Sequence, residues 1–361
     1  MTETEGVPVG GELTALVLGV GGNVSQGILK ALELCEPRPR VVAACVTPES
    51  AGLYTADRSH VSPYASDPGF AGWLTEVCRS EGVDVVMSGA EPVLDALSGL
   101  AAELRKQAGA TAIVSSPETL RVGRDKLRTT EWLDANGFNA PATVDAEDAD
   151  AVERLASELG MPLIAKPRFG KGAQGVVEVS SQRDLDWVAG RDDYVVQQLL
   201  GDEGSEYTVG CFGDSTGQVR GSMAMRRVLQ QGTTVFAEAG DFPEVRAEAE
   251  RIAGSLRPLG PCNVQLRLDG GRPVCFEINV RFSGTTPIRA RLGFNEVSET
   301  IRHYVLGEPA REMPRVTSGI AVRYWNELYL DGDAFRSLAA AGRLDEPAAH
   351  SMLVEDYGVR S

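Results

Sequence analysis

Residues 163–176 read LIAKPRFGKGAQGV, and the interpretation of the whole chain begins from this stretch. An apolar run typical of a strand ends at Lys166, and a glycine-rich loop then leads into a second apolar run. The loop glycines are Gly170, Gly172 and Gly175. Glycine permits positive φ and lets backbone N–H groups approach a phosphate closely. The stretch therefore predicts a phosphate-binding loop between two strands, with a flexible hairpin that binds nothing as the simpler alternative.

Lysine is scarce in this chain, which makes its positions informative. Only five of the 35 basic residues are lysine, and three of these five, Lys126, Lys166 and Lys171, fall between residues 126 and 171. Lysine provides a compact, mobile ammonium that arginine does not reproduce. We expect these three lysines to bind phosphate groups, although a chance cluster on a solvated face would give the same pattern.

A second stretch, VCFEINVRFSGTT at residues 274–286, carries the polar side chains that a phosphoryl-transfer site needs. Strand alternation places Glu277, Asn279 and Arg281 on one face and Phe276, Ile278 and Val280 on the other. Carboxylate and amide oxygens suit Mg²⁺, and an arginine beside them can stabilise a transferring phosphoryl group. The Asp-Gly-Gly turn at residues 269–271 brings Gln265 opposite Glu277, as a further oxygen ligand. A solvated outer strand face is the alternative.

The segment between these stretches, VVQQLLGDEGSEYTV at residues 195–209, is weaker evidence by itself. An apolar strand turns through two glycines into a second strand that begins at Glu206. Such a connection can present backbone groups to an adenine edge and a carboxylate to ribose hydroxyls.

The rhythm of the chain predicts two kinds of architecture. From residue 13 to about 116, strands alternate with helices, which indicates a parallel sheet with helices on both faces. Ser116 followed by Pro117 is typical of a helix start and marks a boundary near residue 117. Beyond it, most strands are joined by short glycine-containing turns, as in an α+β unit with antiparallel sheets. The segment from Val46 to Gly69 is expected to be a loop.

Composition excludes several classes of protein. The net charge of −16 argues against nucleic acid and against anionic membranes as partners. No apolar window of transmembrane length occurs, and residues 1–12 are expected to be a disordered tail and not a signal peptide. The six cysteines are scattered without a CxxC motif, which fits buried thiols in the cytoplasm.

Taken together, these segments resemble the ATP-grasp superfamily, and the order Glu-x-Asn-x-Arg with the upstream glutamine is most similar to its carbamoyl-phosphate-synthetase-like branch. The resemblance covers about residues 13–310. It implies an α/β plus α+β chain, with an ATP-grasp fold preceded by a small Rossmann-like parallel-sheet domain. The implied parts are 1–12 as a tail, 13–117 as the N-terminal domain and 118–310 as the ATP-grasp domain, with a lid subdomain at about 140–200. Residues 311–361 would be a strand and helix extension that completes the grasp domain.

The resemblance also implies roles for individual residues. ATP would lie between two subdomains, with phosphates bound by Lys126 and Lys166 and covered by the loop from Gly170 through Lys171 and Gly172 to Gly175. The adenine hinge would comprise Gln197, Gln198, Leu199 and Leu200, and Glu206 would hold the ribose. Mg²⁺ would be bound by Glu277 and Asn279 with help from Gln265, and Arg281 would face the γ-phosphate. The hinge glutamines stand where a glutamate is common in the family, and Val280 stands where a proline is frequent.

The implied activity is that of an ATP-dependent carboxylate–amine ligase that acts through an acyl phosphate and releases ADP and phosphate. Glu91 follows a parallel strand at the end where α/β sheets bind ligands, and its carboxylate could receive an α-ammonium group. We therefore expect amino-acid substrates, with dipeptide or γ-glutamyl ligation. Arg289 and Arg291 could grip a carboxylate, or could equally be helix-surface arginines. Arg226 is grouped with them as a substrate residue. A carboxylate kinase like carbamoyl phosphate synthetase is an alternative, and a homo-oligomer is common in the family.

Two further motifs offer competing functions. The glycine-rich LGVGGNVSQG at residues 18–27 would serve a nicotinamide-dependent oxidoreductase, but its glycines do not fit G-x-G-x-x-G, and the second strand lacks the expected acidic end. The sequence GDSTG around Ser215 has the letters of a nucleophile elbow, but it joins two antiparallel strands, and no histidine is expected beside it. A nucleotide-binding module without catalytic activity is the remaining alternative.

Overall fold

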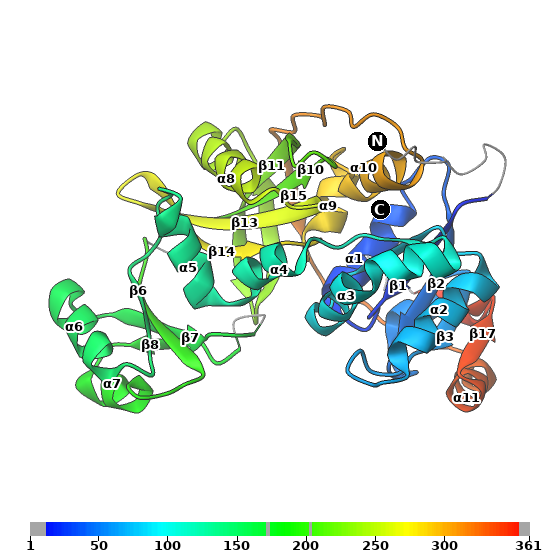
Figure 1. Cartoon of the computed structure of the whole chain (residues 1–361), viewed down its shortest axis with the longest axis horizontal. Coiled ribbons are helices and arrows are strands. Elements are labelled where there is room, and N and C mark those ends of the chain that lie inside the picture. The colour runs from blue at the N-terminus through cyan, green and yellow to red at the C-terminus, as the bar shows by residue number, and fades with distance from the viewer. Residues whose placement is uncertain (1–11, 171–173, 202–203, 354–361) are drawn as a thin grey trace, which may run out of the picture.

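The computed structural model describes residues 12–170, 174–201 and 204–353 (Figure 1). Within these residues the strands form two six-stranded sheets, one four-stranded sheet and one two-stranded sheet. No helix in this part of the chain is both long enough and apolar enough to cross a membrane. Two of the three larger sheets line the candidate site from opposite sides.

The N-terminal sheet is a parallel sheet covered on both faces, as the sequence predicts. Its strands, in spatial order, are β17 (Arg343–Asp345), β3 (Arg58–Val61), β2 (Arg40–Cys45), β1 (Thr14–Leu18), β4 (Val85–Ser88) and β5 (Thr111–Ala112). Helix α1 (Asn23–Leu32) packs on one face with Ala15 and Val17 of β1, whereas α2 (Phe70–Glu81) and α3 (Glu91–Ala108) pack on the other with Leu16 and Leu18. A strand buried on both faces reads as a continuous apolar run.

The prediction of a loop between Val46 and Gly69 is wrong, because this segment contains the short helix η1 (Ala51–Tyr54) and strand β3. The sequence of β3, Arg-Ser-His-Val, has no apolar run that marks a strand. Strand β17 pairs antiparallel with β3, and the Arg58 guanidinium lies 2.6 Å from the carboxylate of Asp345. The edge strand β3 is therefore stabilised by a segment that lies almost 300 residues later in the chain.

Two helices connect the N-terminal sheet to the rest of the molecule. Helix α4 (Pro117–Arg124) begins as predicted, since the Ser116 hydroxyl accepts a hydrogen bond from the backbone N–H of Thr119. Helix α5 (Lys126–Ala135) begins after Asp125, which acts as its N-cap and accepts bonds from the N–H groups of Leu127 and Arg128.

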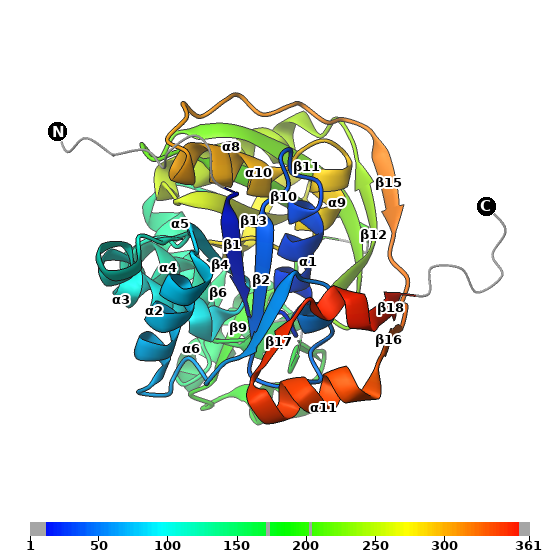
Figure 2. The same ribbon diagram turned by 90° about the vertical axis from the view of Figure 1, so that its right-hand side faces the viewer.

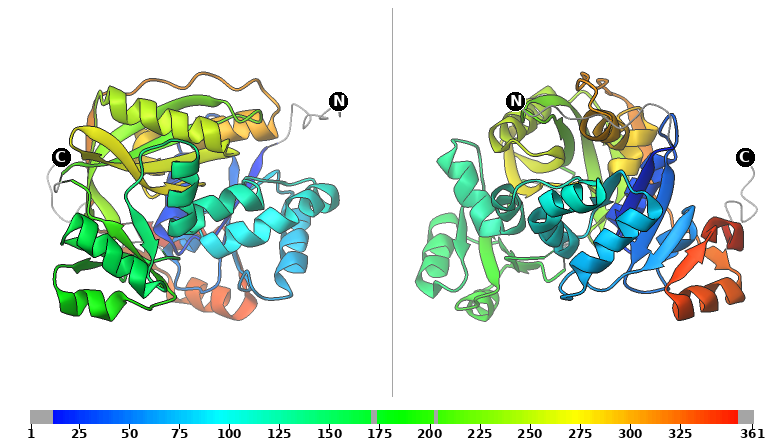
Figure 3. Two further views of the ribbon diagram at one scale, coloured as in Figure 1. Left: turned by 60° about the vertical axis from the view of Figure 1, so that its left-hand side comes forward. Right: turned by 45° about the vertical axis from the view of Figure 1, so that its right-hand side comes forward.

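The four-stranded sheet, with its two helices, lies at one end of the molecule (Figure 3). Its strands, in spatial order, are β6 (Thr143–Asp145), β9 (Tyr194–Gln198), β7 (Leu163–Pro167) and β8 (Val177–Val179). Helices α6 (Ala149–Leu159) and α7 (Gln182–Val188) share a core with Leu163, Ala165 and Val196. Alternation along β7 therefore turns Ile164 and Lys166 toward the opposite face, which lines the candidate site.

The large antiparallel sheet supplies the other side of the site. Its strands, in spatial order, are β14 (Arg272–Asn279), β13 (Gly260–Asp269), β10 (Glu206–Gly213), β11 (Val219–Gln230), β12 (Thr233–Ala239) and β15 (Gly319–Val322). Helix α8 (Pro243–Leu256) packs on β10, β11, β13 and β14. Three short helical elements follow β14, namely α9 (Thr286–Arg291), α10 (Glu296–Thr300) and the π-helical η2 (Ile301–Val305).

The segment after residue 310 contributes to two sheets and not only to the large one (Figure 2). Strand β15 joins the large sheet beside β12, whereas β17 joins the N-terminal sheet. Between them lie α11 (Gly332–Ala341) and a ribbon of β16 (Leu328–Leu330) and β18 (Ser351–Leu353), with the short helix η3 (Pro347–His350) before β18. Residues 311–353 thus extend the large sheet, as expected, and also the N-terminal sheet, and residues 354–361 lie outside the described residues.

The glycines of residues 18–27 and their neighbours allow close packing between backbone segments. A Cβ atom on Gly27, inside α1, would lie 2.8 Å from Cδ of Pro287 in α9. A Cβ atom on Gly89, after β4, would lie 2.2 Å from Cγ1 of Val24. Gly19 adopts a φ of 72°, a conformation that other residues rarely adopt. These contacts pack Gly19 and Gly27 closely against other parts of the protein, whereas Gly21 and Gly22 are exposed.

We predict that Gly27→Ala destabilises the protein, although the same change in most helices is stabilising. Replacing glycine by alanine inside a helix gains about 0.5–1 kcal/mol, whereas overpacking costs about 1–3 kcal/mol. Gly99 of α3 is the matched control, because a Cβ atom there meets nothing within 4 Å. Thermal and denaturant unfolding should show a lower midpoint for Gly27→Ala and an unchanged or higher midpoint for Gly99→Ala. Equal midpoints for the two variants would contradict the packing argument.

Candidate active site

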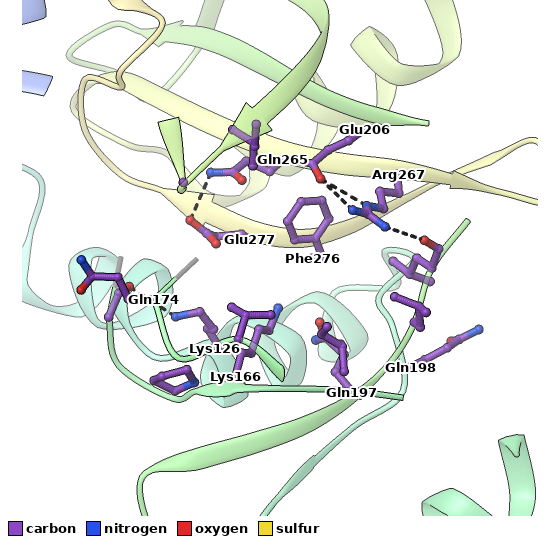
Figure 4. Close-up of a pocket in the computed structure, with 18 of the residues that line it drawn as sticks. Lys126, Lys166, Gln174, Gln197, Gln198, Glu206, Gln265, Arg267, Phe276 and Glu277 are labelled. Atoms are coloured by element: carbon purple, nitrogen blue, oxygen red, sulfur yellow. Dashed lines mark hydrogen bonds and ion pairs between the residues drawn. The ribbon is translucent and has the colours of Figure 1, made fainter. Parts of the chain in front are cut away.

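A pocket of about 260 Å³ lies between the four-stranded sheet and the large sheet (Figure 4). It is lined from one side by β7, β9 and the start of α5, and from the other by β10, β11, β13 and β14. The pocket brings together ten of the residues that the sequence predicts for a nucleotide and metal site: Lys126, Lys166, Gly170, Gln197, Gln198, Leu199, Leu200, Glu206, Gln265 and Glu277. These residues come from segments more than 100 positions apart, so the folded chain assembles one cavity from the separate sequence stretches.

The glycine-rich loop is described only at its two ends. Gly170 lines the pocket with a φ of 145°, and its carbonyl oxygen accepts a hydrogen bond from Lys126 Nζ at 3.3 Å. Gly175 has a φ of 72° and its carbonyl oxygen accepts a bond from the Tyr194 hydroxyl at 3.0 Å. Lys171 and Gly172, which the sequence assigns to the same loop, lie outside the described residues.

Lys166 is buried at the end of β7, with only 7% of its surface exposed. Among the described residues its ammonium makes no hydrogen bond, and it lies 5.5 Å from the centre of the Phe276 ring. Burial lowers the pKa of Lys166 to about 8, and although the charge of Glu277 opposes this effect, nearby Lys126 adds to it. The pocket thus contains a poorly solvated cation that an anionic ligand would stabilise.

Glu277 is held by two amides in the arrangement predicted for a metal site. Its Oε1 atom accepts bonds from Nε2 of Gln265 at 3.1 Å and from Nδ2 of Asn279 at 3.0 Å, and Gln265 and Glu277 are direct partners across β13 and β14. Burial acts to raise the pKa of Glu277, but Lys126 and Lys166 outweigh it, so that the pKa lies below its ordinary value. The carboxylate is therefore ionised at neutral pH.

This set of donors fits Mg²⁺ that is shared with a phosphate ligand. No cluster of three or more His, Cys, Asp or Glu side chains that could hold a metal occurs among the described residues. Mg²⁺ in proteins is usually bound by one or two carboxylates together with substrate phosphates and water. Glu277 supplies one such carboxylate opposite two lysines, and the amide nitrogens of Gln265 and Asn279 donate to it. The Gln265 Oε1 atom accepts a hydrogen bond from Arg227. This arrangement matches the pattern better than a closed protein cage.

Glu206 lies at the other end of the pocket between two arginines that the sequence reasoning missed. Its Oε1 atom accepts bonds from Nε and Nη2 of Arg227 at 2.9 and 2.7 Å. Its Oε2 atom accepts bonds from Arg267, the shorter at 2.9 Å. Arg267 also donates to the carbonyl oxygen of Leu200 in the predicted hinge at 3.0 Å. Glu206 thus orients two guanidinium groups at the pocket wall.

The missed arginines have a sequence signal that strand alternation provides. Arg267 stands directly opposite Glu206 across β10 and β13. Arg226 stands opposite Tyr207, so that its neighbour Arg227 shares the face of Glu206. Strand β11 runs to Gln230, so Arg227 lies within the strand. Arg226, predicted as a substrate residue, instead faces away from the pocket and pairs with Glu238 at 2.6 Å.

A β-bulge changes the predicted faces of β14. The register with β13 shifts between Gln265 and Leu266, so that Gln265 pairs with Glu277 and Leu266 pairs with Cys275. Phe276 is the extra residue and lines the pocket together with Glu277. The prediction that Phe276 lies on the opposite face from Glu277 is wrong, because a bulge breaks the period of two.

Arg281 and Glu91, predicted for separate roles, form an ion pair. The Arg281 Nε atom lies 2.6 Å from Oε1 of Glu91 at the first turn of α3, and Arg281 Nη1 donates to the carbonyl oxygen of Phe282 at 2.9 Å. Neither residue lines the pocket described above. The pair joins the end of β14 to the carboxyl end of β4, where the sequence predicts a substrate.

The two arginines of α9 lie in different environments, and Arg289 is not on the helix surface. Arg289 is 1% exposed, and its guanidinium lies 2.6 Å from Oε1 of Glu296, which is itself fully buried. It also donates to the hydroxyl of Thr285 at 2.7 Å. Arg289 therefore has its charge neutralised inside the protein, away from solvent. Arg291 is exposed on the helix surface, as the alternative interpretation states.

Ser215 in the GDSTG turn has a histidine neighbour that the sequence did not indicate. His303 Nε2 lies 3.0 Å from the Ser215 hydroxyl, and it also accepts the backbone N–H of Ser215 at 3.0 Å. The N–H groups of Thr216, Gly217 and Gln218 all donate to Asp214, so none of these three is available to stabilise an oxyanion. The expectation of no nearby histidine is wrong, and the arrangement anchors the turn to η2.

The comparisons with known proteins agree with this geometry. A family model described as "ATP-grasp in the biosynthetic pathway with Ter operon" matches residues 191–328. The carbamoyl phosphate synthase large chain of Xylella fastidiosa is 27% identical over 303 residues, which are 75% of this chain and 27% of that protein. The arginine-specific large chain of Bacillus subtilis is 25% identical over 66% of this chain and 23% of its own length. This chain thus spans about a quarter of these relatives.

Solved structures show the same fold at lower sequence identity. An ADP complex of N5-carboxyaminoimidazole ribonucleotide synthetase superposes with a TM-score of 0.70 at 16% identity, covering 91% of this chain and 84% of that one. A biotin carboxylase from Campylobacter jejuni, in complex with β-γ-ATP, gives a TM-score of 0.68 at 17% identity, covering 86% and 76%. The predicted combination of an ATP-grasp fold and a preceding parallel sheet is confirmed. The chain has the ATP-grasp fold and is similar in sequence to the large chains of carbamoyl phosphate synthase.

Proposed function

We propose that this protein is an ATP-dependent carboxylate–amine ligase that uses Mg²⁺. The observation that carries the proposal is the charge of the pocket. Among the described residues, four cations (Lys126, Lys166, Arg227 and Arg267) and two carboxylates line it, in a chain whose net charge is −16. A cavity with excess positive charge inside an acidic protein fits a polyphosphate ligand.

The two ends of the pocket fit the two ends of ATP. Lys126, Lys166 and Gly170 would surround the phosphates, with Glu277, Gln265 and Asn279 providing oxygen ligands for the metal. Ile164, Leu229 and the hinge from Gln197 to Leu200 also line the pocket and would contact the base. ADP or an ATP analogue is bound in two of the structures with this fold, which supports the assignment.

The proposed reaction has two steps. A carboxylate oxygen of the first substrate attacks the terminal phosphorus of ATP, the bond between that phosphorus and the bridging oxygen breaks, and ADP leaves. The amine then attacks the acyl carbon of the resulting acyl phosphate, the carbon–oxygen bond to phosphate breaks, and the amine loses a proton. Bound Mg²⁺ would neutralise charge on the phosphate oxygens. Exclusion of water by the glycine-rich loop protects the acyl phosphate from hydrolysis.

Arg281 and Glu91 would act at the substrate end. Glu91 holds the Arg281 guanidinium at 2.6 Å, at the junction of the two six-stranded sheets. Arg281 would stabilise the oxygens of the departing phosphate, and Glu91 would share its remaining acceptor capacity with a substrate ammonium group. This pair supports amino acids as substrates, and hence a dipeptide or γ-glutamyl product, more directly than Arg289 does. We also propose a cytoplasmic location, which the six free and buried cysteines support.

The first prediction tests the activity itself. Incubation with ATP, Mg²⁺ and pooled amino acids should release ADP in a substrate-dependent manner, with a product whose mass equals two substrates minus water. ADP with only an acyl phosphate or its hydrolysis product would identify a carboxylate kinase. Tight ADP binding with no turnover in any pool would indicate a binding module. Reduction of NAD or NADP in place of ADP release would favour the oxidoreductase, whose glycine loop is packed against protein atoms.

The second prediction concerns the pH dependence of nucleotide binding. Because the pKa of Lys166 is lowered to about 8 in the free protein, and an anionic ligand favours the ammonium form, binding takes up a proton above that pH. The dissociation constant for MgADP should be constant below pH 8 and rise up to about tenfold per pH unit above it. Phosphate groups ionise near pH 6 and do not interfere. Lys166→Arg, which does not titrate, should give a flat profile between pH 7 and 9.5 in calorimetry, whereas a wild-type profile that is equally flat would contradict the assignment.

The third prediction concerns the metal. Glu277→Gln should abolish the difference between ADP affinity with and without Mg²⁺, because the carboxylate is the charged ligand of the set. Asn279→Ala should reduce the same difference by about 10- to 100-fold, as loss of a charge-assisted contact costs about 1.5–3 kcal/mol. Glu206→Gln, at the nucleoside end, is the control and should weaken binding equally in both conditions. Retention of the full Mg²⁺ effect by Glu277→Gln would place the metal elsewhere.

A further inference from the structure

Strand β15 forms an open edge of the large sheet, and its outward side chains are unusually exposed for apolar residues. Ile320 is 64% exposed, Val322 is 71% exposed, and Tyr324, just beyond the strand, is 70% exposed. Figure 2 shows β15 at the margin of the molecule, beyond β12. Edge strands of monomeric proteins usually carry lysine, proline or a covering segment, and residues 319–322 read Gly-Ile-Ala-Val.

The exposed side chains continue across the sheet in two rows. Val228, Phe236 and Val322 are neighbours across β11, β12 and β15. In the adjacent row, Arg226 pairs with Glu238, and Glu238 stands opposite Ile320. We call the side chains of these two rows, together with Tyr324 and Trp325, the β15 patch.

The β15 patch lies on the sheet face that α8 covers only in part. Ser222 of β11 donates a hydrogen bond to Glu250 of α8 at 2.7 Å, so even-numbered residues of β11 face that helix. Helix α8 packs on β10, β11, β13 and β14. Val228 and the residues of β12 and β15 beside it extend past the helix, and Val228 is 51% exposed. The nucleotide pocket lies on the opposite face, where Arg227 points.

The backbone of β15 also has unused hydrogen-bonding groups at its open edge. Arg323 donates its backbone N–H to the carbonyl oxygen of Val235 at 2.7 Å, which directs the odd-numbered residues of this strand toward β12. The N–H and C=O groups of Ile320 and Val322 therefore point away from β12. Among the described residues, β15 is the last strand of the sheet order and has no strand on that side.

We propose that a second copy of this chain pairs with the β15 patch, with the two β15 strands antiparallel about a two-fold axis at Ala321. In this register Ile320 faces Val322 of the second copy, and the four outward backbone groups of each strand form ladder hydrogen bonds. The same residues then contact each other from both sides, as an isologous two-fold interface requires. The large sheets of the two copies would become one continuous sheet of twelve strands.

Charge and area favour a second copy over an unrelated partner. Two chains of net charge −16 repel, but the β15 patch carries one Arg226 and one Glu238, so its own charge balances. Five of its side chains are at least half exposed: Val228, Ile320, Val322, Tyr324 and Trp325. A stable dimer buries about 800 Å² per partner, and aromatic residues bury up to about 150–250 Å² each. The two aromatics thus extend the patch toward the area that association needs.

The test is the oligomeric state of the full chain, and it does not depend on the proposed enzymatic function. Sedimentation velocity between about 1 and 100 µM, the range of moderate protein affinities, should show a dimer for the wild type. Val322→Pro removes an N–H that makes no bond within the chain and should give a monomer at the same concentrations. Ile320→Lys, which places a charge at the edge, should do the same. Leu159→Lys, at an exposed position on α6, is the matched control and should remain dimeric.

A disulfide trap fixes the register independently. Antiparallel residues on such an axis have Cα atoms about 4.5 Å apart, within the range that a disulfide spans. Ala321→Cys should therefore form a covalent dimer on mild oxidation, and the six native cysteines are all buried and do not interfere. MgADP binding and unfolding midpoints of each variant verify that it is folded.

Three outcomes would overturn the proposal. A wild type that is monomeric up to 100 µM has no such interface. A dimer that persists in both Val322→Pro and Ile320→Lys, with no cross-link through Ala321→Cys, uses another surface. A dimer that forms only after removal of residues 354–361 would identify that segment as the occupant of the edge.

Discussion

The burial of Lys166 beside Glu277 is the constraint on which the candidate site depends. An ammonium that lies inside a pocket and lacks a hydrogen-bonded carboxylate is unfavourable, and the lowering of its pKa from 10.5 to about 8 corresponds to roughly 3 kcal/mol. The unfolded chain binds this proton more tightly, so the free energy of unfolding rises between about pH 8 and 10.5. Below pH 8 the protein carries the full cost of the charged form. A ligand that brings negative charge removes this cost, which is why the same residue that weakens the fold strengthens binding.

The position of Lys166 is in turn fixed by the connection between the two sheets. Asp125 caps α5 and accepts two bonds from Arg168, at 2.9 Å each, just beyond the end of β7. The backbone N–H of Lys126 donates to the carbonyl oxygen of Arg168. A Cβ atom on Gly123 would lie 2.9 Å from the carbonyl oxygen of Ile278, so the preceding turn of α4 packs closely against β14. The junction of α4 and α5 therefore contacts both walls of the pocket and sets the distance between the lysines and Glu277.

The order and type of most elements, and many of the pocket residues, could be predicted from the sequence, because long apolar runs and glycine turns depend on local chemistry. Prediction failed where long-range pairing decides the outcome. Strand β3 has a polar sequence and is stabilised by β17, which no local pattern reveals. The bulge at Gln265 turns Phe276 into the pocket. Strand β11 continues to Gln230, so that Arg227 lines the pocket and Arg226 faces away from it. The ion pairs of the interior could not be predicted either, since only the fold reveals that Glu296 is buried beside Arg289.

The two glycine-rich loops of the chain show why a motif must be interpreted with its surroundings. Residues 18–27 join a strand to a helix, the usual context of a dinucleotide loop, yet the glycines there receive Pro287, Ser50 and other protein atoms at close range. The ends of the loop after Lys166 join two antiparallel strands and border a cavity lined by cations. The first loop allows two parts of the protein to approach each other, and the second leaves room for a ligand. The first loop is packed against Pro287 and Ser50, whereas the second borders Lys166, whose buried ammonium makes no hydrogen bond among the described residues.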